Sequence, residues 1–336
     1  MLDKRRLGRT QLVVSAVSFG ALPIQRCTLT ESEPVLQAAL QAGINFIDTA
    51  RAYTDSEEKI GTYLSQDRGK YYLASKSMER SYEGMKQDIE LSLKNMQTDY
   101  IDLYQIHNIK RREDLEAVLQ EGGALQALQE KQQEGKIGFI GVTGHNFDLL
   151  TEAIATNHFD TVQAPFNIVE QEAEKKLFPL AREKDLGMIV MKPVGGGQIE
   201  QVELSLRFIL EHEGLVAIPG MDKVEHIAAN TKAAQPIRAL TEAERAALVQ
   251  EAEVVGKVFC RRCGYCTPCT VGIDIPQLFI FRLQYNRYGL TKAIPARYNN
   301  MAKKASDCIK CGVCEKRCPY DLPIIEWLDE MAQKLG

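Results

Sequence analysis

Four polar residues in the first third of the chain stand where they could do chemistry. Asp48, Lys76 and His107 each close a short apolar run, and Tyr53 lies five residues beyond Asp48. Each has a structural explanation when it is taken alone, as a helix cap, a solvated strand end, a hydrogen-bonded core histidine or a surface tyrosine. Taken together, they predict proton transfer to a bound small molecule.

Tyr53 is the proton donor in this prediction. A phenol has a pKa near 10 and releases a proton reluctantly near neutrality, but an adjacent ammonium favours the phenolate. Lys76 would supply that ammonium, and the carboxylate of Asp48 would keep Lys76 charged and in place. His107 would donate a hydrogen bond to a substrate carbonyl and orient it.

The second group of chemically active residues is a set of closely spaced cysteines. Of the nine cysteines, only Cys27 lies outside residues 260–318, and we expect it to be structural. The downstream run has the spacing and the following proline of a bacterial ferredoxin, and the upstream run is a variant with a shorter last gap and Thr270 in place of proline. The runs are Cys308, Cys311, Cys314 and Cys318, and Cys260, Cys263, Cys266 and Cys269.

Metal binding is the natural interpretation of these eight thiols. A protein of the reducing cytoplasm does not normally build a disulfide framework. Zinc is the alternative, but zinc ligands usually come as two separated C-x2-C pairs. Three consecutive cysteines at this spacing suit a chain that wraps around a cubane, so we expect two 4Fe-4S clusters.

The elements that must position the first group alternate between apolar runs and amphipathic helical stretches over residues 16–230. Eight such units predict an α/β fold, a closed (β/α)8 TIM barrel, followed by a mostly helical iron-sulfur domain. A doubly wound open sheet is the alternative, but no G-x-G-x-x-G follows the first run. The strand candidates lie near Val17, Phe46, Tyr71, Ile101, Ile137, Thr161, Gly187 and Leu215.

Flanking elements complete the predicted organisation. Residues 5–13 read as a hairpin over the amino-terminal end of the barrel, and Thr30 with Glu33 has the spacing of a capping box at the first helix. Thr241 with Glu244 repeats that spacing at a helix over 242–255. The tail is expected to hold helices over 275–290 and 295–305. The predicted domains are a barrel at 1–235, a linker helix at 236–256 and a cluster domain at 257–336.

The chain resembles the aldo-keto reductase family over about residues 5–235. The resemblance lies in N-F-I-D-T-A-R-A-Y at 45–53, L-A-S-K-S at 73–77 and D-L-Y-Q-I-H at 102–107. It implies a (β/α)8 barrel, a nicotinamide cofactor bound without a Rossmann domain, and reduction of aldehydes or ketones to alcohols. The four catalytic positions of the family match Asp48, Tyr53, Lys76 and His107.

The same resemblance implies where the cofactor, NADPH or NADH, is bound. The carboxamide would meet Gln163 and Thr143, which with Gly144 replaces the usual Ser-Asn pair, and the ring would meet Met191. The residues that grip a 2′-phosphate in many members align with Gly220, Met221 and His226, so the choice between NADH and NADPH stays open. The implied cofactor-binding residues are Thr143, Gln163, Met191, Lys192, Gly195, Gly220, Lys223 and Asn230.

The tail resembles the two-cluster ferredoxin-type domains that are fused to some aldo-keto reductases. In two-cluster ferredoxins the fourth cysteine of each run binds the other cluster. Carried over here, one cluster would be held by Cys260, Cys263, Cys266 and Cys318. The other would be held by Cys308, Cys311, Cys314 and Cys269. The alternatives are that each run serves its own cluster, or that the irregular upstream run binds nothing.

Composition restricts the remaining possibilities. The chain has 336 residues, of which 45% are hydrophobic and 26% charged, as in an ordinary globular protein. We find no signal peptide and no apolar run near the roughly 20 residues that span a bilayer, so we expect a cytoplasmic protein that does not bind a membrane. The net charge of −4 combines an acidic barrel region with a basic tail. The positively charged residues of the tail form no long run, which favours electrostatic contact between the two domains over binding of nucleic acid.

Two functions of different classes follow. The first is an enzyme that reduces a small-molecule carbonyl, with clusters of structural, sensing or electron-transfer role. The alternative is an iron-sulfur electron-transfer protein that uses the barrel to dock a nicotinamide and passes electrons to a protein partner. A cluster passes one electron and a nicotinamide passes a hydride, and no flavin motif is visible to connect them. The complete catalytic set therefore favours the enzyme.

Overall fold

The computed structural model describes residues 2–256, 259–260, 266–286, 289–318 and 320–335. The chain forms two compact units, Met1–Val249 and Gln250–Gly336. This division falls inside the helix that we expected to link the two domains. The finer limits at 235 and 256 stay a prediction.

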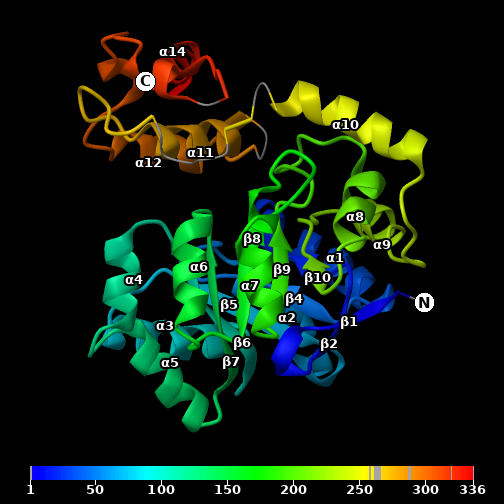
Figure 1. Ribbon diagram of the computed structural model, residues 1–336. Coiled ribbons are helices and arrows are strands. Elements are labelled where there is room, and N and C mark those ends of the chain that lie inside the picture. The colour runs from blue at the N-terminus through cyan, green and yellow to red at the C-terminus, as the bar shows by residue number, and fades with distance from the viewer. Residues whose placement is uncertain (1, 257–258, 261–265, 287–288, 319, 336) are drawn as a thin grey trace. The chain divides into compact units, whose positions relative to one another are not determined.

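The first unit is a closed barrel of parallel strands (Figure 1). Each strand of its 8-stranded sheet pairs with the next along the chain. Parallel bridges from Val17 to Ala217 and from Gly20 to Gly220 join the first and last strands, which confirms the predicted barrel. The strands are β3 (Phe19–Gly20), β4 (Phe46–Asp48), β5 (Tyr72–Ser77), β6 (Ile101–Ile109), β7 (Ile137–Gly144), β8 (Thr161–Pro165), β9 (Gly187–Met191) and β10 (Leu215–Ala217).

Helices surround the barrel and connect its strands (Figure 1). They bury an apolar face against the sheet, as crossover helices of parallel strands must. The helices are α1 (Leu29–Gln41), α2 (Ser56–Leu64), α3 (Tyr82–Asn95), α4 (Arg112–Leu119), α5 (Ala124–Gln133), α6 (Phe147–Ala155), α7 (Leu177–Glu183), α8 (Val202–Leu210) and α9 (Val224–Thr231). After them, α10 (Glu242–Gly256) spans the division between the two units. Short 3-10 turns lie at Gly8–Thr10, Leu22–Arg26, Ser65–Lys70 and Glu172–Glu174.

The start of α1 corrects one prediction. The capping box is formed by Thr28 and Glu31, and not by Thr30 and Glu33. Both pairs have the same spacing, but Thr28 is extended, with φ −65° and ψ 168°, and it accepts a hydrogen bond from the backbone N–H of Glu31. The predicted box of Thr241 and Glu244 is present at the start of α10, where the Glu244 carboxylate accepts from the Thr241 backbone N–H at 2.8 Å.

The amino-terminal hairpin covers one end of the barrel, as predicted. Its strands β1 (Lys4–Arg6) and β2 (Val13–Ser15) pair antiparallel. Between them Leu7 has no exposed surface and packs among apolar side chains of the barrel interior, including Phe46 and Leu103. A Cβ added to Gly187 would lie 2.6 Å from Cγ of Leu7. The end of the barrel is therefore filled tightly, and glycine at 187 leaves room for Leu7.

The second unit is mostly helical, as predicted. Phe279 and Trp327 meet edge to face, with ring centroids 5.0 Å apart, in a core against which the cysteines also pack. The helix expected over 295–305 starts earlier and is shorter. It can start before Pro295 because proline is tolerated within the first turn of a helix. The elements are α11 (Ile275–Asn286), α12 (Ala293–Asn299), a 3-10 turn at Ala305–Asp307, α13 (Val313–Arg317) and α14 (Ile324–Leu335).

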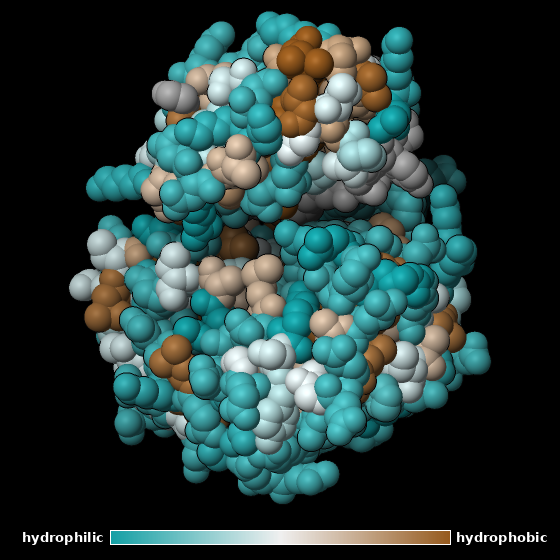
Figure 2. Space-filling model, turned by 90° about the vertical axis from the view of Figure 1, so that its left-hand side faces the viewer, coloured by the Kyte–Doolittle hydropathy of each residue, from teal (hydrophilic) through white to brown (hydrophobic). Residues whose placement is uncertain are grey.

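The surface is mainly hydrophilic in the view of Figure 2, with apolar residues in small groups. Large exposed apolar side chains, such as Met78, Val254 and Ile309, come from distant parts of the chain. Among the described residues, no helix combines the length and the apolar character that crossing a membrane requires.

Candidate functional site

The barrel site is built around a buried ion pair. Lys76 at the end of β5 and Asp48 at the end of β4 are 0% and 2% exposed. The Lys76 ammonium donates to Asp48 Oδ1 at 2.5 Å and to the carbonyl oxygen of Thr49 at 2.8 Å. Gln105 on β6 donates to the second carboxylate oxygen, Asp48 Oδ2, at 3.1 Å. Three neighbouring strands thus fix the position of one cation.

Burial and neighbouring charges act on this cation in opposite directions. Burial lowers the pKa of Lys76, while the carboxylates of Asp48 and Glu57 oppose that shift. Burial also holds the pKa of His107 well below its usual value, and the positive charges of Lys76, Arg80 and Lys110 add to the effect. The site therefore favours a neutral imidazole next to an ammonium.

Tyr53 and His107 lie next to this pair. The Lys76 ammonium is 5.1 Å from the centroid of the Tyr53 ring. The rings of Tyr53 and His107 meet nearly at right angles, with centroids 5.9 Å apart. The structure thus brings together all four residues that the sequence marked for proton transfer, although they come from three different strands and one loop.

The loop that carries Tyr53 is held by a buried polar network that the sequence analysis missed. Arg51 in this loop donates to Glu57 at 2.5 Å, and its backbone N–H donates to the carbonyl oxygen of Lys76 at 3.0 Å. Glu57, 2% exposed, also accepts from the hydroxyls of Ser75 at 2.6 Å and Ser92 at 2.8 Å. No sequence signal distinguishes Glu57 from the exposed Glu58 beside it, because only the fold buries one of them.

Two of the predicted carboxamide contacts are neighbours in the sheet. Thr143 on β7 and Gln163 on β8 are register partners, and both are 1% exposed. The Thr143 hydroxyl accepts a hydrogen bond from the backbone N–H of Asn108 at 2.8 Å. Gln163 Oε1 is buried and has no hydrogen-bond partner among the described residues. An unpaired buried amide oxygen is costly, so it fits a site that a ligand amide completes.

The predicted contacts after β9 show the same feature. Met191 packs against the apolar cluster inside the barrel. The next residue, Lys192, has a buried Nζ atom for which the described part of the chain supplies no partner. Gly195 has a positive φ of 57°, a conformation that glycine adopts without strain. The amine and this turn are suited to an anionic group such as a pyrophosphate.

The predicted adenosine segment lies at the end of the barrel sheet. Gly220 and Lys223 are exposed, whereas Asn230 in the last turn of α9 is 5% exposed. The carboxylate of Asp222 pairs with Arg26 at 3.1 Å and with His226 at 3.0 Å. Two of the side chains that could meet a phosphate here are therefore already engaged by an acid.

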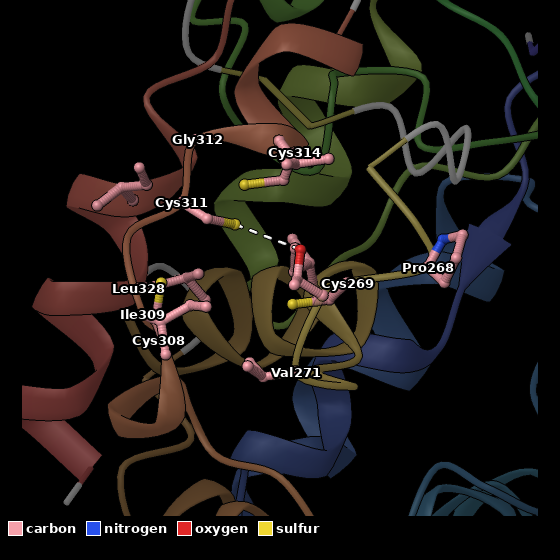
Figure 3. Close-up of a pocket in the computed structure, with 13 residues that line it drawn as sticks. Pro268, Cys269, Val271, Cys308, Ile309, Cys311, Gly312, Cys314 and Leu328 are labelled. Carbon is pink, nitrogen blue, oxygen red and sulfur yellow. Dashed lines mark hydrogen bonds between the residues drawn. The ribbon is translucent and has the colours of Figure 1, made fainter.

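Four cysteines of the second unit line one cavity (Figure 3). Cys308, Cys311 and Cys314 line it together with Cys269, the last cysteine of the upstream run. The Thr270 hydroxyl lies 3.4 Å from Sγ of Cys311. The remaining lining is apolar, with side chains such as Ile275, Ile325 and Leu328.

This cavity has the donor chemistry that an iron-sulfur cluster requires, since thiolates are the ligands. Hydrogen bonds from the Thr270 hydroxyl and the Val313 backbone lower the pKa of Cys311. Burial raises the pKa of Cys314. Within the described residues, no group of three His, Cys, Asp or Glu side chains is placed to hold a single metal ion. Cys260, Cys266 and Cys318 pack against the same core, and Cys263 lies outside the described residues.

Sequence models of known families match both units. The Aldo/keto reductase family matches residues 16–202, more than half of the chain. A 4Fe-4S dicluster domain matches residues 259–323. Both predicted resemblances are confirmed.

Individual relatives agree with these matches. L-galactose dehydrogenase of Arabidopsis thaliana is 32% identical over 219 residues, covering 60% of this chain and 68% of that protein. The uncharacterized oxidoreductase YqkF of Bacillus subtilis (strain 168) is 26% identical over 217 residues, with the same coverage of 60% and 68%.

Solved structures share the barrel fold. The holo form of aldo-keto reductase AKR11C1 from Bacillus halodurans superposes with a TM-score of 0.66 and 24% identity, over 75% of this chain and 96% of that chain. An aldo-keto reductase from Klebsiella pneumoniae in complex with NADPH gives a TM-score of 0.63 and 23% identity, over 74% and 95%.

The cavity generates a prediction about which cysteines share a cluster. If Cys269 completes the site of the downstream run, Cys269→Ser should alter the same electron paramagnetic resonance signal of the reduced protein as Cys308→Ser. The Cys27→Ser variant serves as the control and should keep the iron content and both signals. A Cys269→Ser spectrum that matches that of Cys260→Ser instead would mean that each run serves its own cluster.

Proposed function

Because the chain belongs to the aldo/keto reductase family and carries a 4Fe-4S dicluster domain, we propose that its barrel reduces an aldehyde or ketone to an alcohol with NADPH or NADH. The observation that carries this proposal is the position of the Tyr53 ring. Its centroid lies 5.1 Å from the buried ammonium of Lys76 and 5.9 Å from the centroid of the His107 ring. The dehydrogenase among the relatives and the NADPH complex among the similar structures support it.

Tyr53 is the proton donor in the proposed reaction. The carbonyl carbon gains a hydride and the carbonyl oxygen gains the phenolic proton, so the substrate leaves as an alcohol and the phenolate is reprotonated from solvent. The Lys76 ammonium stabilises that phenolate, and Asp48 keeps Lys76 charged despite its burial. His107, held neutral, donates a hydrogen bond that orients the carbonyl.

Two of the residues that would hold the cofactor, Gln163 and Lys192, have buried polar atoms without a partner among the described residues. Gln163 and Thr143 would meet the carboxamide, Met191 the ring, and Lys192 with Gly195 the pyrophosphate. Gly220, Lys223 and Asn230 would contact the adenosine half. The chemistry supplied there by a bound reduced nicotinamide is a hydride for the carbonyl carbon.

The cluster domain is proposed to hold two 4Fe-4S clusters of structural, sensing or electron-transfer role. Its ligands would be Cys260, Cys263, Cys266 and Cys318 for one cluster, and Cys269, Cys308, Cys311 and Cys314 for the other. An electron-transfer protein would then be a partner of this unit. The second candidate function, in which the barrel only docks a nicotinamide for electron transfer, rests on the same cysteines. Eight thiolate ligands favour the reducing cytoplasm as the location.

Replacing Tyr53 tests the proposed proton donor. Tyr53→Phe should lower kcat/KM for a test aldehyde such as para-nitrobenzaldehyde by about 10²–10⁴-fold, because only the proton source is lost. The dissociation constant for NADPH should stay within a few-fold of the parent. The matched control is Tyr72→Phe, on the same strand as Lys76 but at its other end, where the side chain packs against Leu7 and its neighbours. Turnover of Tyr53→Phe equal to that control would remove Tyr53 from the reaction.

A second prediction concerns the choice of cofactor. Since Asp222 engages both Arg26 and His226, we expect NADH to bind at least comparably to NADPH. Fluorescence titration of both cofactors measures this directly. Asp222→Asn should improve the binding of NADPH relative to NADH, because the carboxylate that engages Arg26 and His226, and that would repel a phosphate, is removed. A large preference of the parent protein for NADPH would contradict the prediction.

A further inference from the structure

Arg80 lies in the loop between β5 and α3, and its guanidinium contacts the end of the neighbouring strand β6. Its Nη2 atom donates hydrogen bonds to the carbonyl oxygens of His107 at 2.8 Å and of Asn108 at 3.1 Å. We propose that Arg80 is a positioning residue for carbonyl reduction, which fixes the backbone that carries His107. The inference rests on the proposed function of the barrel. The sequence pattern did not single out Arg80.

The end of β6 is irregular and needs such support. The pairing with β7 shifts register between Ile106 and Ile109. Within the shift, Asn108 adopts a left-handed backbone with φ 61°, a conformation that few residues other than glycine and asparagine adopt. Its N–H is bound by the Thr143 hydroxyl at 2.8 Å and its carbonyl oxygen by Arg80. The backbone N–H and the carbonyl oxygen of Asn108 are therefore both hydrogen-bonded to side chains of neighbouring elements.

The two residues held by Arg80 carry polar atoms suited to a ligand. Nδ1 of His107 and Oδ1 of Asn108 are buried, and the described residues offer neither of them a hydrogen-bond partner. Such atoms gain most from a ligand when their positions are fixed beforehand. Loss of the guanidinium would leave two carbonyl oxygens without their donor and would let the irregular strand end relax, moving the His107 ring relative to Tyr53.

Arg80 also belongs to the charges that face His107. Those charges are the ammonium of Lys76 on β5, the guanidinium of Arg80 and the ammonium of Lys110 just after β6, and all three lower the pKa of His107 after burial. Acids lie beside two of these cations: Asp48 pairs with Lys76, and the charges of Asp114 and Glu79 act on Arg80. A variant without the Arg80 charge should therefore hold His107 neutral over a narrower range of pH.

The chain offers a matched control at the other end of the same strands. Arg68 donates to the carbonyl oxygens of Tyr71 at 2.9 Å and of Tyr100 at 2.9 Å, just before β5 and β6 begin. Arg68→Gln thus removes the same kind of bridge far from Tyr53. The test compares Arg80→Gln and Arg80→Lys with Arg68→Gln in the full-length protein with its clusters. We would measure kcat and KM for para-nitrobenzaldehyde, thermal unfolding, and the titration of His107 by nuclear magnetic resonance.

We expect Arg80→Gln to lower kcat about tenfold with NADPH binding unchanged, and to raise the titration midpoint of His107, because one of the positive charges that lower its pKa is lost. Arg80→Lys should keep the His107 titration near that of the parent, because the charge remains. It should still lose several-fold in kcat, since the lysine side chain is one bond shorter and its ammonium does not reach the two carbonyl oxygens as Nη2 of Arg80 does. If Arg80→Gln does not fold, the kcat of Arg80→Lys decides whether Arg80 positions His107. Arg68→Gln should reduce stability only.

The inference is wrong if Arg80→Gln matches Arg68→Gln in kcat and leaves the His107 titration unchanged, or if Arg80→Lys retains full kcat. Only five histidines occur in the chain, so the His107 signal can be assigned with a His107→Asn variant. This readout needs no turnover. A protein that reduces no carbonyl but shows the shifted His107 titration would overturn the proposed function while confirming that Arg80 fixes the environment of His107.

Discussion

The buried pair of Lys76 and Asp48 is the interaction on which the barrel site depends. A fully buried ammonium is stable only with a carboxylate and further hydrogen bonds, and removal of one partner of such a pair costs about 3–5 kcal/mol. Asp48, Lys76 and Gln105 come from three adjacent strands, so the pair forms only when these strands lie side by side. The buried ammonium lies against the ring of Tyr53, where it would stabilise a phenolate in the proposed reaction.

A second layer of polar residues keeps this arrangement rigid. Arg51 and Glu57 hold the loop that carries Tyr53, and Arg80 holds the strand end that carries His107. Tyr53 and His107, the proposed proton donor and orienting group, are therefore each held through polar contacts of the backbone next to them. The second unit depends on a different constraint, which is that thiols from two runs far apart in the sequence must line one cavity. Among the described residues of the upstream run, only Cys269 reaches it.

Most of the fold could be predicted from the sequence, because strands such as β5 and β6 are short, mainly apolar runs whose ends are marked by Lys76 and His107. The four residues marked for proton transfer were identified for the same reason, and the structure brings them together. The capping box at α1 was wrong because Thr28 and Thr30 both precede a glutamate by three residues, and only the backbone conformation distinguishes them. Glu57, Arg51 and Arg80 could not be found, since their roles come from burial and from contacts across the sheet that spacing does not encode.

Transfer of an isotopic label tests most directly whether the barrel reduces carbonyls. The holoprotein is incubated with NADPH deuterated at the transferable position and with para-nitrobenzaldehyde, and the alcohol is analysed by mass spectrometry and nuclear magnetic resonance. The account predicts one deuterium on the carbinol carbon for each NADPH oxidised, and none in the Tyr53→Phe variant beyond its residual turnover. Oxidation of NADPH that bleaches the clusters and yields no labelled alcohol would contradict it.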